Sequence, residues 1–273
     1  MILEIIKAMI FGVVEGVTEW LPISSTGHMI LLNEFLKLNV SSAFWNMFLV
    51  VIQLGAILAV VVLYFNKLVP FSFNNGFKIK KDIMSMWFKI IIACIPAGIV
   101  VKWNDELDAI FYNYKTVAIT LILFGILFIV IENYNKGKRS KINSISEIGY
   151  NTAFIIGVFQ LIAAVFPGTS RSGATIVGAL LIGVSRTVAA EFTFFLAIPV
   201  MLGASLLKIL KFGFHFTGLE MTILTAGMVT AFVVSIIIIK FLMSYIKKHD
   251  FKVFGWYRII LGIVVIVYFA IRR

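Results

Sequence analysis

Long apolar stretches separated by short polar loops dominate the sequence. A helix needs about 20 apolar residues to cross a bilayer, and six stretches are long enough. They cover residues 44–66, 85–103, 115–134, 187–211, 219–245 and 252–271. The pattern predicts an all-α polytopic membrane protein with six transmembrane helices.

Two further apolar regions, 2–38 and 148–185, are interrupted by polar residues and a proline. Pro22 and Pro167 each lack a backbone donor and end the preceding helix. A half-helix, a polar turn and a second half-helix are typical of a re-entrant segment. Such irregular backbone survives at membrane depth only where protein or a watery cavity surrounds it. The sequence therefore predicts two re-entrant broken helices.

Composition supports a membrane protein and excludes several other classes. The chain is 61% hydrophobic and 14% charged, whereas soluble domains carry about 25% charged residues. The net charge is +11, but no basic segment interleaved with aromatic residues predicts a nucleic-acid partner. Cys94 is the only cysteine, which excludes a disulfide or a thiolate metal site within one chain.

Basic residues predict which loops face the cytoplasm. Loops 67–84, 135–147 and 246–252 are richer in Lys and Arg than the loops on the other side. The positive-inside rule therefore places them in the cytoplasm and both termini outside. The first broken region then enters from outside and the second from the cytoplasm, and three spans follow each.

The two halves also align locally. Pro22-Ile-Ser-Ser-Thr26 matches Pro167-Gly-Thr-Ser-Arg171, which places Ser25 opposite Ser170. We predict one integral membrane domain over residues 1–273, with inverted-topology repeats at approximately 1–134 and 148–273. In such repeats the broken helices meet near the midplane of the bilayer.

The first break supplies acids, hydroxyls and an imidazole. Glu15 and Glu19 are four residues apart, so on a helix they share one face. Carboxylates in lipid need partners, which favours a site that binds a divalent cation or orients an imidazole and water over a solvated helix end. His28 follows Ser25 by one turn, and a serine near a histidine and carboxylates is the outline of an activated nucleophile. The simpler alternative is that the hydroxyls cap the new helix.

The second break predicts an anion site. Ser170 to Gly173 stand where a half-helix begins, and its amides and dipole favour an anion. Arg171 adds a planar, permanently charged group suited to phosphate oxygens. Gly168 and Gly173 let the backbone approach a ligand closely. The alternative is a structural ion pair between Arg171 and either Glu191 or a glutamate of the first half. Both can hold, since a resting ion pair can open to a phosphate.

These residues carry a resemblance. Glu15-Gly-Val-Thr-Glu-Trp-Leu-Pro-Ile-Ser-Ser-Thr-Gly-His28 and Pro167-Gly-Thr-Ser-Arg-Ser-Gly-Ala-Thr175 resemble the two signatures of the undecaprenyl-diphosphatase family, also called bacitracin-resistance proteins. The resemblance covers essentially the whole chain. It implies hydrolysis of undecaprenyl diphosphate to undecaprenyl phosphate and inorganic phosphate, which recycles the carrier lipid for cell-wall synthesis and gives bacitracin resistance.

The resemblance also implies a divalent cation (Mg²⁺ or Ca²⁺) and a location in the bacterial cytoplasmic membrane, with the site facing the outer side. The expected partners are a polyprenyl diphosphate lipid and the bilayer, without nucleic acid; the oligomeric state is open, with a homodimer as one candidate. We expect the catalytic residues to be Ser25, His28, Glu19, Glu15 and Arg171, with Glu15 and Glu19 also holding the metal. The expected substrate-binding residues are Ser24, Thr26, Gly168, Ser170, Arg171, Ser172, Gly173 and Thr175.

A secondary transporter is the alternative from another class. Broken helices that meet at the midplane in an inverted repeat are typical of transporters, and Arg171 beside a half-helix N-terminus suits an anionic substrate. The residues alone do not separate transport from hydrolysis, and the resemblance favours hydrolysis. Whether Ser25 attacks phosphorus itself or orients a water stays open.

Overall fold

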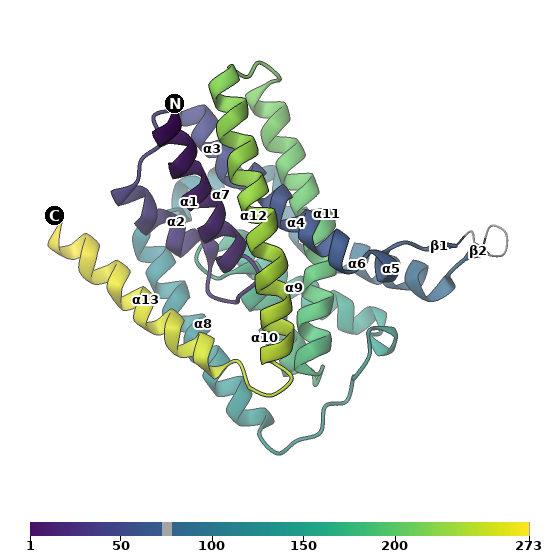
Figure 1. The fold of residues 1–273 in the computed structure, drawn as a ribbon. Helices are drawn as coiled ribbons and strands as arrows, with labels where there is room; N and C mark the ends of the chain where they lie inside the picture. The colour runs from purple at the N-terminus through teal and green to yellow at the C-terminus, as the bar shows by residue number, and fades with distance from the viewer. Residues whose placement is uncertain (73–77, 273) are drawn as a thin grey trace.

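The computed structural model describes residues 1–72 and 78–272, and nearly all the ordered structure in it is helical (Figure 1). The helices are α1 (Ile2–Thr18), α2 (Ser25–Phe35), α3 (Ser42–Val51), α4 (Gln53–Leu63), α5 (Phe65–Leu68), α6 (Lys81–Val100), α7 (Asn104–Phe111), α8 (Tyr114–Asn135), α9 (Tyr150–Val165), α10 (Arg171–Leu181), α11 (Arg186–Phe212), α12 (Gly218–Tyr245) and α13 (Lys252–Ile271). The remaining elements are the short strands β1 (Phe71–Ser72) and β2 (Lys78–Ile79) and the 3-10 helices η1 (Val101–Trp103) and η2 (Ile145–Glu147). The prediction of an all-α protein is confirmed.

Six helical segments of the described chain are long and apolar enough to span a membrane. They are α3 with α4, α6 with η1, α8, α11, α12 and α13. Each coincides with a predicted span, and large apolar side chains such as Leu58, Ile237 and Ile260 are exposed on their outer faces. Such an apolar exterior is expected where lipid replaces water as the surrounding medium. The chain is a polytopic membrane protein.

Both interrupted regions form a helix, a turn and a second helix, as predicted. α1 and α9 end before the prolines, and α2 and α10 begin after Ser24 and Ser170. These two serines have φ of 73° and 67° and are the non-glycine residues of the described chain with positive φ. Such left-handed backbone costs about 1–2 kcal/mol per residue and is commonest at functional sites.

When the two turns are matched by their structure, the residues that correspond differ from the pairs that the sequence alignment gives. Ser24 and Ser170 both serve as helix caps, each accepting the amide three residues ahead. Ser25 therefore corresponds to Arg171, and the alignment of Ser25 with Ser170 was wrong by one residue. The reason is that the second turn contains one more residue between Pro167 and its capping serine than the first turn contains after its proline.

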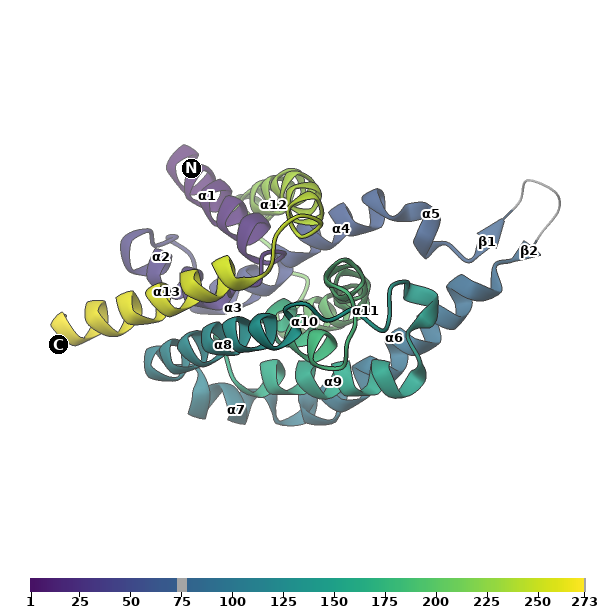
Figure 2. The same ribbon diagram turned by 90° about the horizontal axis from the view of Figure 1, so that it is seen from below.

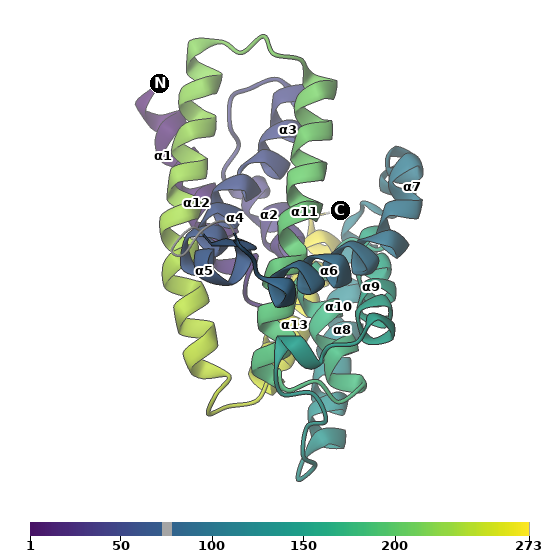
Figure 3. The ribbon, with the colours of Figure 1, turned by 90° about the vertical axis from the view of Figure 1, so that its right-hand side faces the viewer.

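The two halves of the chain interlock through pairs of helices. α1 lies along α12, α9 lies along α6, and α8 lies along α13 (Figures 1 and 2). α3 and α4 fill the space between the long helices α11 and α12 (Figure 3). Each of these pairs joins one helix of the first half to one of the second. Such pairing between the halves is expected of a chain built from two repeated helical units. The inverted orientation of the two units, and the depth to which the broken helices enter the membrane, stay predictions.

The backbones of α8 and α13 touch. A Cβ built on Gly125 would lie 2.7 Å from the carbonyl oxygen of Gly255, and the reverse distance is also 2.7 Å. Only glycine permits so close an approach. Arg258 follows Gly255 by one turn, so this contact fixes the position of the arginine relative to α8.

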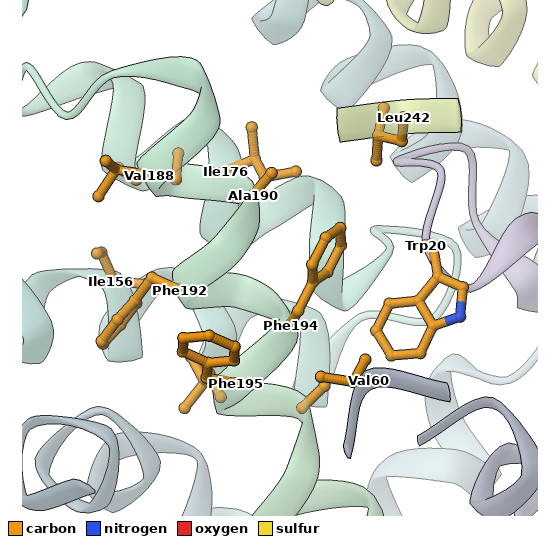
Figure 4. Packing of buried hydrophobic residues seen from close by; sticks show 14 of the residues in the cluster. Trp20, Val60, Ile156, Ile176, Val188, Ala190, Phe192, Phe194, Phe195 and Leu242 are labelled. Atoms are coloured by element: carbon orange, nitrogen blue, oxygen red, sulfur yellow. The ribbon is translucent and has the colours of Figure 1, made fainter. Parts of the chain in front are cut away.

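A cluster of buried apolar side chains around α11 anchors the first break. Phe192, Phe194 and Phe195 of α11 pack with residues of α4, α9, α10 and α12 (Figure 4). Trp20, from the turn after α1, packs edge-on against Phe194 with ring centroids 5.2 Å apart. Because Trp20 directly follows Glu19, this packing fixes the position of the acidic residue.

We expect Gly125→Ala to destabilise the protein, because the new methyl group would meet backbone that cannot rotate away. Overpacking of this kind costs about 1–3 kcal/mol, so the thermal unfolding temperature in detergent should fall. The matched control is Gly203→Ala in α11, since no atom lies within 4 Å of a Cβ built there. That control should be neutral or more stable by up to about 1 kcal/mol. Equal unfolding temperatures for the two variants would contradict the close contact.

Candidate active site

Two buried carboxylates lie at the end of α1. Glu15 is 1% exposed and Glu19 is 7% exposed. The amide of Glu19 donates to the carbonyl of Glu15 at 3.0 Å, so helical spacing continues through Glu19 and the two share a face, as predicted. Oε1 of Glu15 has no hydrogen-bond partner among the described residues. A buried carboxylate oxygen without a donor is costly, so the site favours a further positive charge or donor.

Glu19 is the residue at which the two breaks meet. Its Oε1 accepts a hydrogen bond from Nη2 of Arg171 in an ion pair, and its Oε2 accepts one from Oγ of Ser25 at 3.2 Å. Its backbone carbonyl accepts from Oγ of Ser172 at 3.1 Å. Ser25 and Arg171 are the first residues of α2 and α10. The N-termini of both half-helices therefore face one carboxylate.

The predicted ion pair of Arg171 is made with the first half. Glu191 instead binds Nζ of Lys67 at 2.6 Å, so it is not the partner of Arg171. Nε of Arg171 is buried and has no hydrogen-bond partner in the part of the chain that the structure describes. The guanidinium thus has a donor left for a second anion.

Free amides lie beside these side chains. The first residues of a helix have no acceptor for their N–H groups within that helix. In α10 these amides belong to Arg171 and Ser172, and in α2 they belong to Ser25 and Thr26. Ser24 and Ser170 satisfy only the third amide of each helix. The remaining amides and the helix dipoles favour an anion in front of both N-termini.

Other predicted binding residues are engaged in packing. Thr175 is fully buried, and its Oγ1 contacts the carbonyl of Arg171 and Oγ1 of Thr193, both at 2.9 Å. A Cβ built on Gly168 would lie 2.4 Å from Oγ1 of Thr120. Gly168 is therefore needed for close packing against α8. A ligand contact for Thr175 or Gly168 stays a prediction.

His28 is turned away from Ser25. Its Nδ1 bonds the carbonyl of Ser24 at 2.7 Å, one turn back, and its Nε2 bonds the hydroxyl of Tyr257 at 2.7 Å. The two rings stack at 8° with centroids 5.6 Å apart. Because a carbonyl only accepts, neutral His28 carries its proton on Nδ1, and Nε2 accepts from Tyr257. The expected contact between Ser25 and His28 is replaced by the bond from Ser25 to Glu19.

A fully buried arginine, Arg258 of α13, holds the two breaks together. Its guanidinium donates to five backbone carbonyls at 2.8–3.5 Å, those of Pro22, Thr120, Leu121, Gly168 and Thr169. These oxygens belong to the first turn, to α8 and to the second turn. A Cβ built on Gly173 would lie 3.1 Å from Nη1, so the positive charge lies directly behind the N-terminus of α10.

The comparisons with known proteins agree on one family. The family model described as bacitracin resistance protein BacA matches residues 8–264. The chain belongs to the BacA family. It is similar to undecaprenyl-diphosphatase 1 of Clostridium acetobutylicum, with 74% identity over 98% of both chains. The undecaprenyl-diphosphatase of Desulfitobacterium hafniense is 70% identical over 99% of this chain and 98% of its own. An undecaprenyl-diphosphatase of Enterococcus faecalis is 61% identical over 98% of both.

Two residues of this BacA-family site, Arg258 and Tyr257, were not predicted from the sequence. Arg258 could have been found, since an arginine inside the apolar stretch 252–271 indicates a functional or structural role. Tyr257 left none, because tyrosine is common near membrane interfaces and its partner His28 is 229 residues away in sequence. Both residues come from α13, which carries neither signature.

We expect Arg258→Met to lower the free energy of unfolding by about 3 kcal/mol or more, because several buried carbonyls lose their donor. Arg258→Lys keeps the charge, but its single ammonium cannot reach carbonyls from three segments, so it should also destabilise the protein. Thermal unfolding in detergent measures both effects. Lys136→Met, which alters an exposed basic residue in the loop after α8 that does not line the cavity described below, is the control. A lysine variant as stable as the parent would show that charge alone suffices.

Proposed function

We propose that this chain hydrolyses undecaprenyl diphosphate to undecaprenyl phosphate and inorganic phosphate, which recycles the carrier lipid for cell-wall synthesis and gives bacitracin resistance. The observation that carries the proposal is the convergence of Ser25 and Arg171 on the carboxylate of Glu19. The hydroxyl of Ser25, the carboxylate of Glu19 as a proton acceptor and the guanidinium of Arg171 as a phosphate-binding group then lie in one site. The similar proteins are named undecaprenyl-diphosphatase, which supports the same substrate.

The second half of the chain binds the terminal phosphate in this proposal. Arg171 exchanges its contact with Oε1 of Glu19 for phosphate oxygens, to which its planar guanidinium can bind through two donors. The free amides of Arg171 and Ser172 point toward the same oxygens. Arg258, behind Gly173, adds positive potential without touching the phosphate. Phosphoryl transfer depends mainly on such positioning and charge stabilisation.

The first half of the chain provides the residue that attacks phosphorus or orients the attacking water. In the serine route, Oγ of Ser25 bonds to the terminal phosphorus while its proton passes to Oε2 of Glu19, the acceptor at 3.2 Å. The bond from phosphorus to the bridging oxygen breaks, and undecaprenyl phosphate leaves with that oxygen. Water then attacks the phosphorus of the phosphoserine, and the bond between phosphorus and Oγ breaks. The proton on Glu19 returns to Oγ of Ser25, and inorganic phosphate leaves with both protons of the water. In the water route, Ser25 orients a water that attacks phosphorus directly.

His28 has a positioning role in this scheme. The sequence predicted that it helps to activate Ser25 as a nucleophile, but both of its ring nitrogens bind other groups. Glu19 therefore replaces it as the proton acceptor. His28 connects the carbonyl of the left-handed cap, Ser24, to Tyr257 of α13, and so fixes the start of α2 in front of the phosphate site.

Glu15 and Glu19 would hold the divalent cation, Mg²⁺ or Ca²⁺. The described residues contain no group of three or more His, Cys, Asp or Glu side chains that could bind a metal. Two carboxylates suit an ion that completes its shell with waters and substrate phosphate oxygens, as Mg²⁺ commonly does. The unpartnered Oε1 of buried Glu15 supports this assignment. A bound cation would neutralise charge on the phosphate oxygens.

The distribution of basic loops supports an orientation for this proposal. With the loops 67–84, 135–147 and 246–252 in the cytoplasm, the first break enters from the outer face of the bacterial cytoplasmic membrane. The diphosphate then reaches the site from the outer leaflet, with its prenyl chain in lipid. The two breaks form the re-entrant parts of an inverted repeat, which agrees with the exchange of helix partners between the halves.

We expect Ser25→Ala to lower turnover by about a thousand-fold or more if the serine is the nucleophile. Ser25→Thr keeps a hydroxyl and should retain part of the activity. The measurement is phosphate release from undecaprenyl diphosphate by purified protein in detergent with a divalent cation, together with acid quenching and mass spectrometry to detect phosphoserine. Substantial activity in Ser25→Ala would select the water route. No release by the parent protein would refute hydrolysis itself.

Removal of divalent cations with a chelator should abolish phosphate release, and Mg²⁺ or Ca²⁺ should restore it. Glu15→Gln keeps the shape of the side chain but removes its charge, so the cation concentration for half-maximal activity should rise about ten-fold or more. Glu191→Gln is the matched control, because this glutamate is paired with Lys67 and not with a residue of the proposed site. Equal cation requirements for the two variants would argue against Glu15 as a ligand.

A further inference from the structure

The C-terminal end of α8 and the loop that follows it lie lowest in Figure 1, and residues of both line a cavity of about 550 Å³. Its walls come from the C-terminal ends of α8, α10 and α12, the N-terminal end of α11, and the loop that follows α8. None of the proposed catalytic residues lines it. Both neighbouring loops, 135–147 and 246–252, belong to the side on which basic residues are concentrated.

The cavity has a large excess of positive charge. Its lining includes the cations Lys138, Arg139, Lys141, Arg186 and Lys247 and the single acid Glu132. The carboxylate of Glu132 is already bound by Arg186 at 2.9 Å and by the amide of Phe251 at 3.0 Å. The side chains of Arg139, Lys141 and Lys247 have no ion-pair or hydrogen-bond partner within residues 1–72 and 78–272. An anion would satisfy them.

The start of α11 adds polar groups to the same cavity. Ser185 caps this 27-residue helix, but its side chain makes no cap hydrogen bond. Oγ of Ser185 is buried and has no partner in the described chain. The amides at the beginning of so long a helix, with its dipole, attract a negative group. The unpaired hydroxyl and the unpaired cations are independent features of one cavity.

One edge of the cavity is apolar. Leu181 is 52% exposed and Tyr134 is 59% exposed, and both belong to the lining. Nζ of Lys138 lies over the ring of Tyr134, 3.1 Å from its centroid. A free inorganic anion gains nothing from the exposed leucine, whereas an amphiphile places its chain there and its headgroup among the cations. Tyrosine is also a common side chain at the level of lipid headgroups.

We propose that this cavity binds the headgroup of an anionic phospholipid from the bilayer leaflet on the same side. Basic pockets between transmembrane helices are suited to such headgroups. Lysines that serve only to orient the chain need no cavity, and Lys78, Lys80 and Lys81, which stand exposed at the β1–β2 hairpin, do not line this one. The lipid would bridge α8 of the first half and α10 to α12 of the second, and so stabilise the assembled halves.

The test compares two charge-matched variants of the full chain purified in a non-ionic detergent. One combines Arg139→Gln, Lys141→Gln and Lys247→Gln in the cavity, and the other combines Lys78→Gln, Lys80→Gln and Lys81→Gln at the hairpin. Native mass spectrometry measures bound phosphatidylglycerol, with phosphatidylcholine of the same chains as the neutral lipid. Thermal unfolding with and without phosphatidylglycerol is the second measurement and shows that both variants are folded.

The cavity variant should bind phosphatidylglycerol about a hundred-fold more weakly at low ionic strength, because each basic residue near an anionic lipid surface contributes about five-fold. The hairpin variant should bind like the parent. Equal losses in both variants would indicate general attraction to a basic surface and would overturn the proposal, as would unchanged binding in the cavity variant. If inorganic phosphate raises the unfolding temperature of the parent as much as phosphatidylglycerol does, the occupant is a free anion and the lipid assignment is wrong.

Discussion

The buried guanidinium of Arg258 is the interaction on which the rest of the site depends. A turn that interrupts a helix inside an apolar protein leaves carbonyls without helical donors, and each must find a partner. Arg258 satisfies carbonyls of both turns and of α8 at once. The contact between Gly125 and Gly255 holds α13 close enough for it to do so. The separation of the two half-helices is thus set by a residue that belongs to neither.

Neither half of the chain holds a complete set of groups. Residues near the first turn provide the carboxylates and the hydroxyl of Ser25, while those near the second provide the guanidinium of Arg171 and the amides of α10. Glu19 joins the two sets through both of its carboxylate oxygens. Because α1 also packs on α12 and α9 on α6, the site can form only when the whole chain has assembled.

The sequence was sufficient for those features that depend on composition along a helix. Apolar length gave the six spans, the prolines gave both breaks, and the spacing of Glu15 and Glu19 gave their common face. Contacts with backbone atoms were not predictable, since a carbonyl bound by Arg258 has no characteristic side chain. The predicted alignment of the two turns was wrong by one residue, because nothing in the sequence distinguishes a serine in left-handed backbone, such as Ser24 or Ser170, from its neighbours.

Those two capping serines have a consequence for how the halves differ. Both hold nearly the same strained φ, and each accepts the third amide of the helix that follows. The next position carries Ser25 in one half and Arg171 in the other, in the same backbone frame and against the same carboxylate. Under the proposed function, the residue that attacks phosphorus and the residue that binds phosphate therefore differ by one side chain at the first helical position, and the same main-chain conformation supports both.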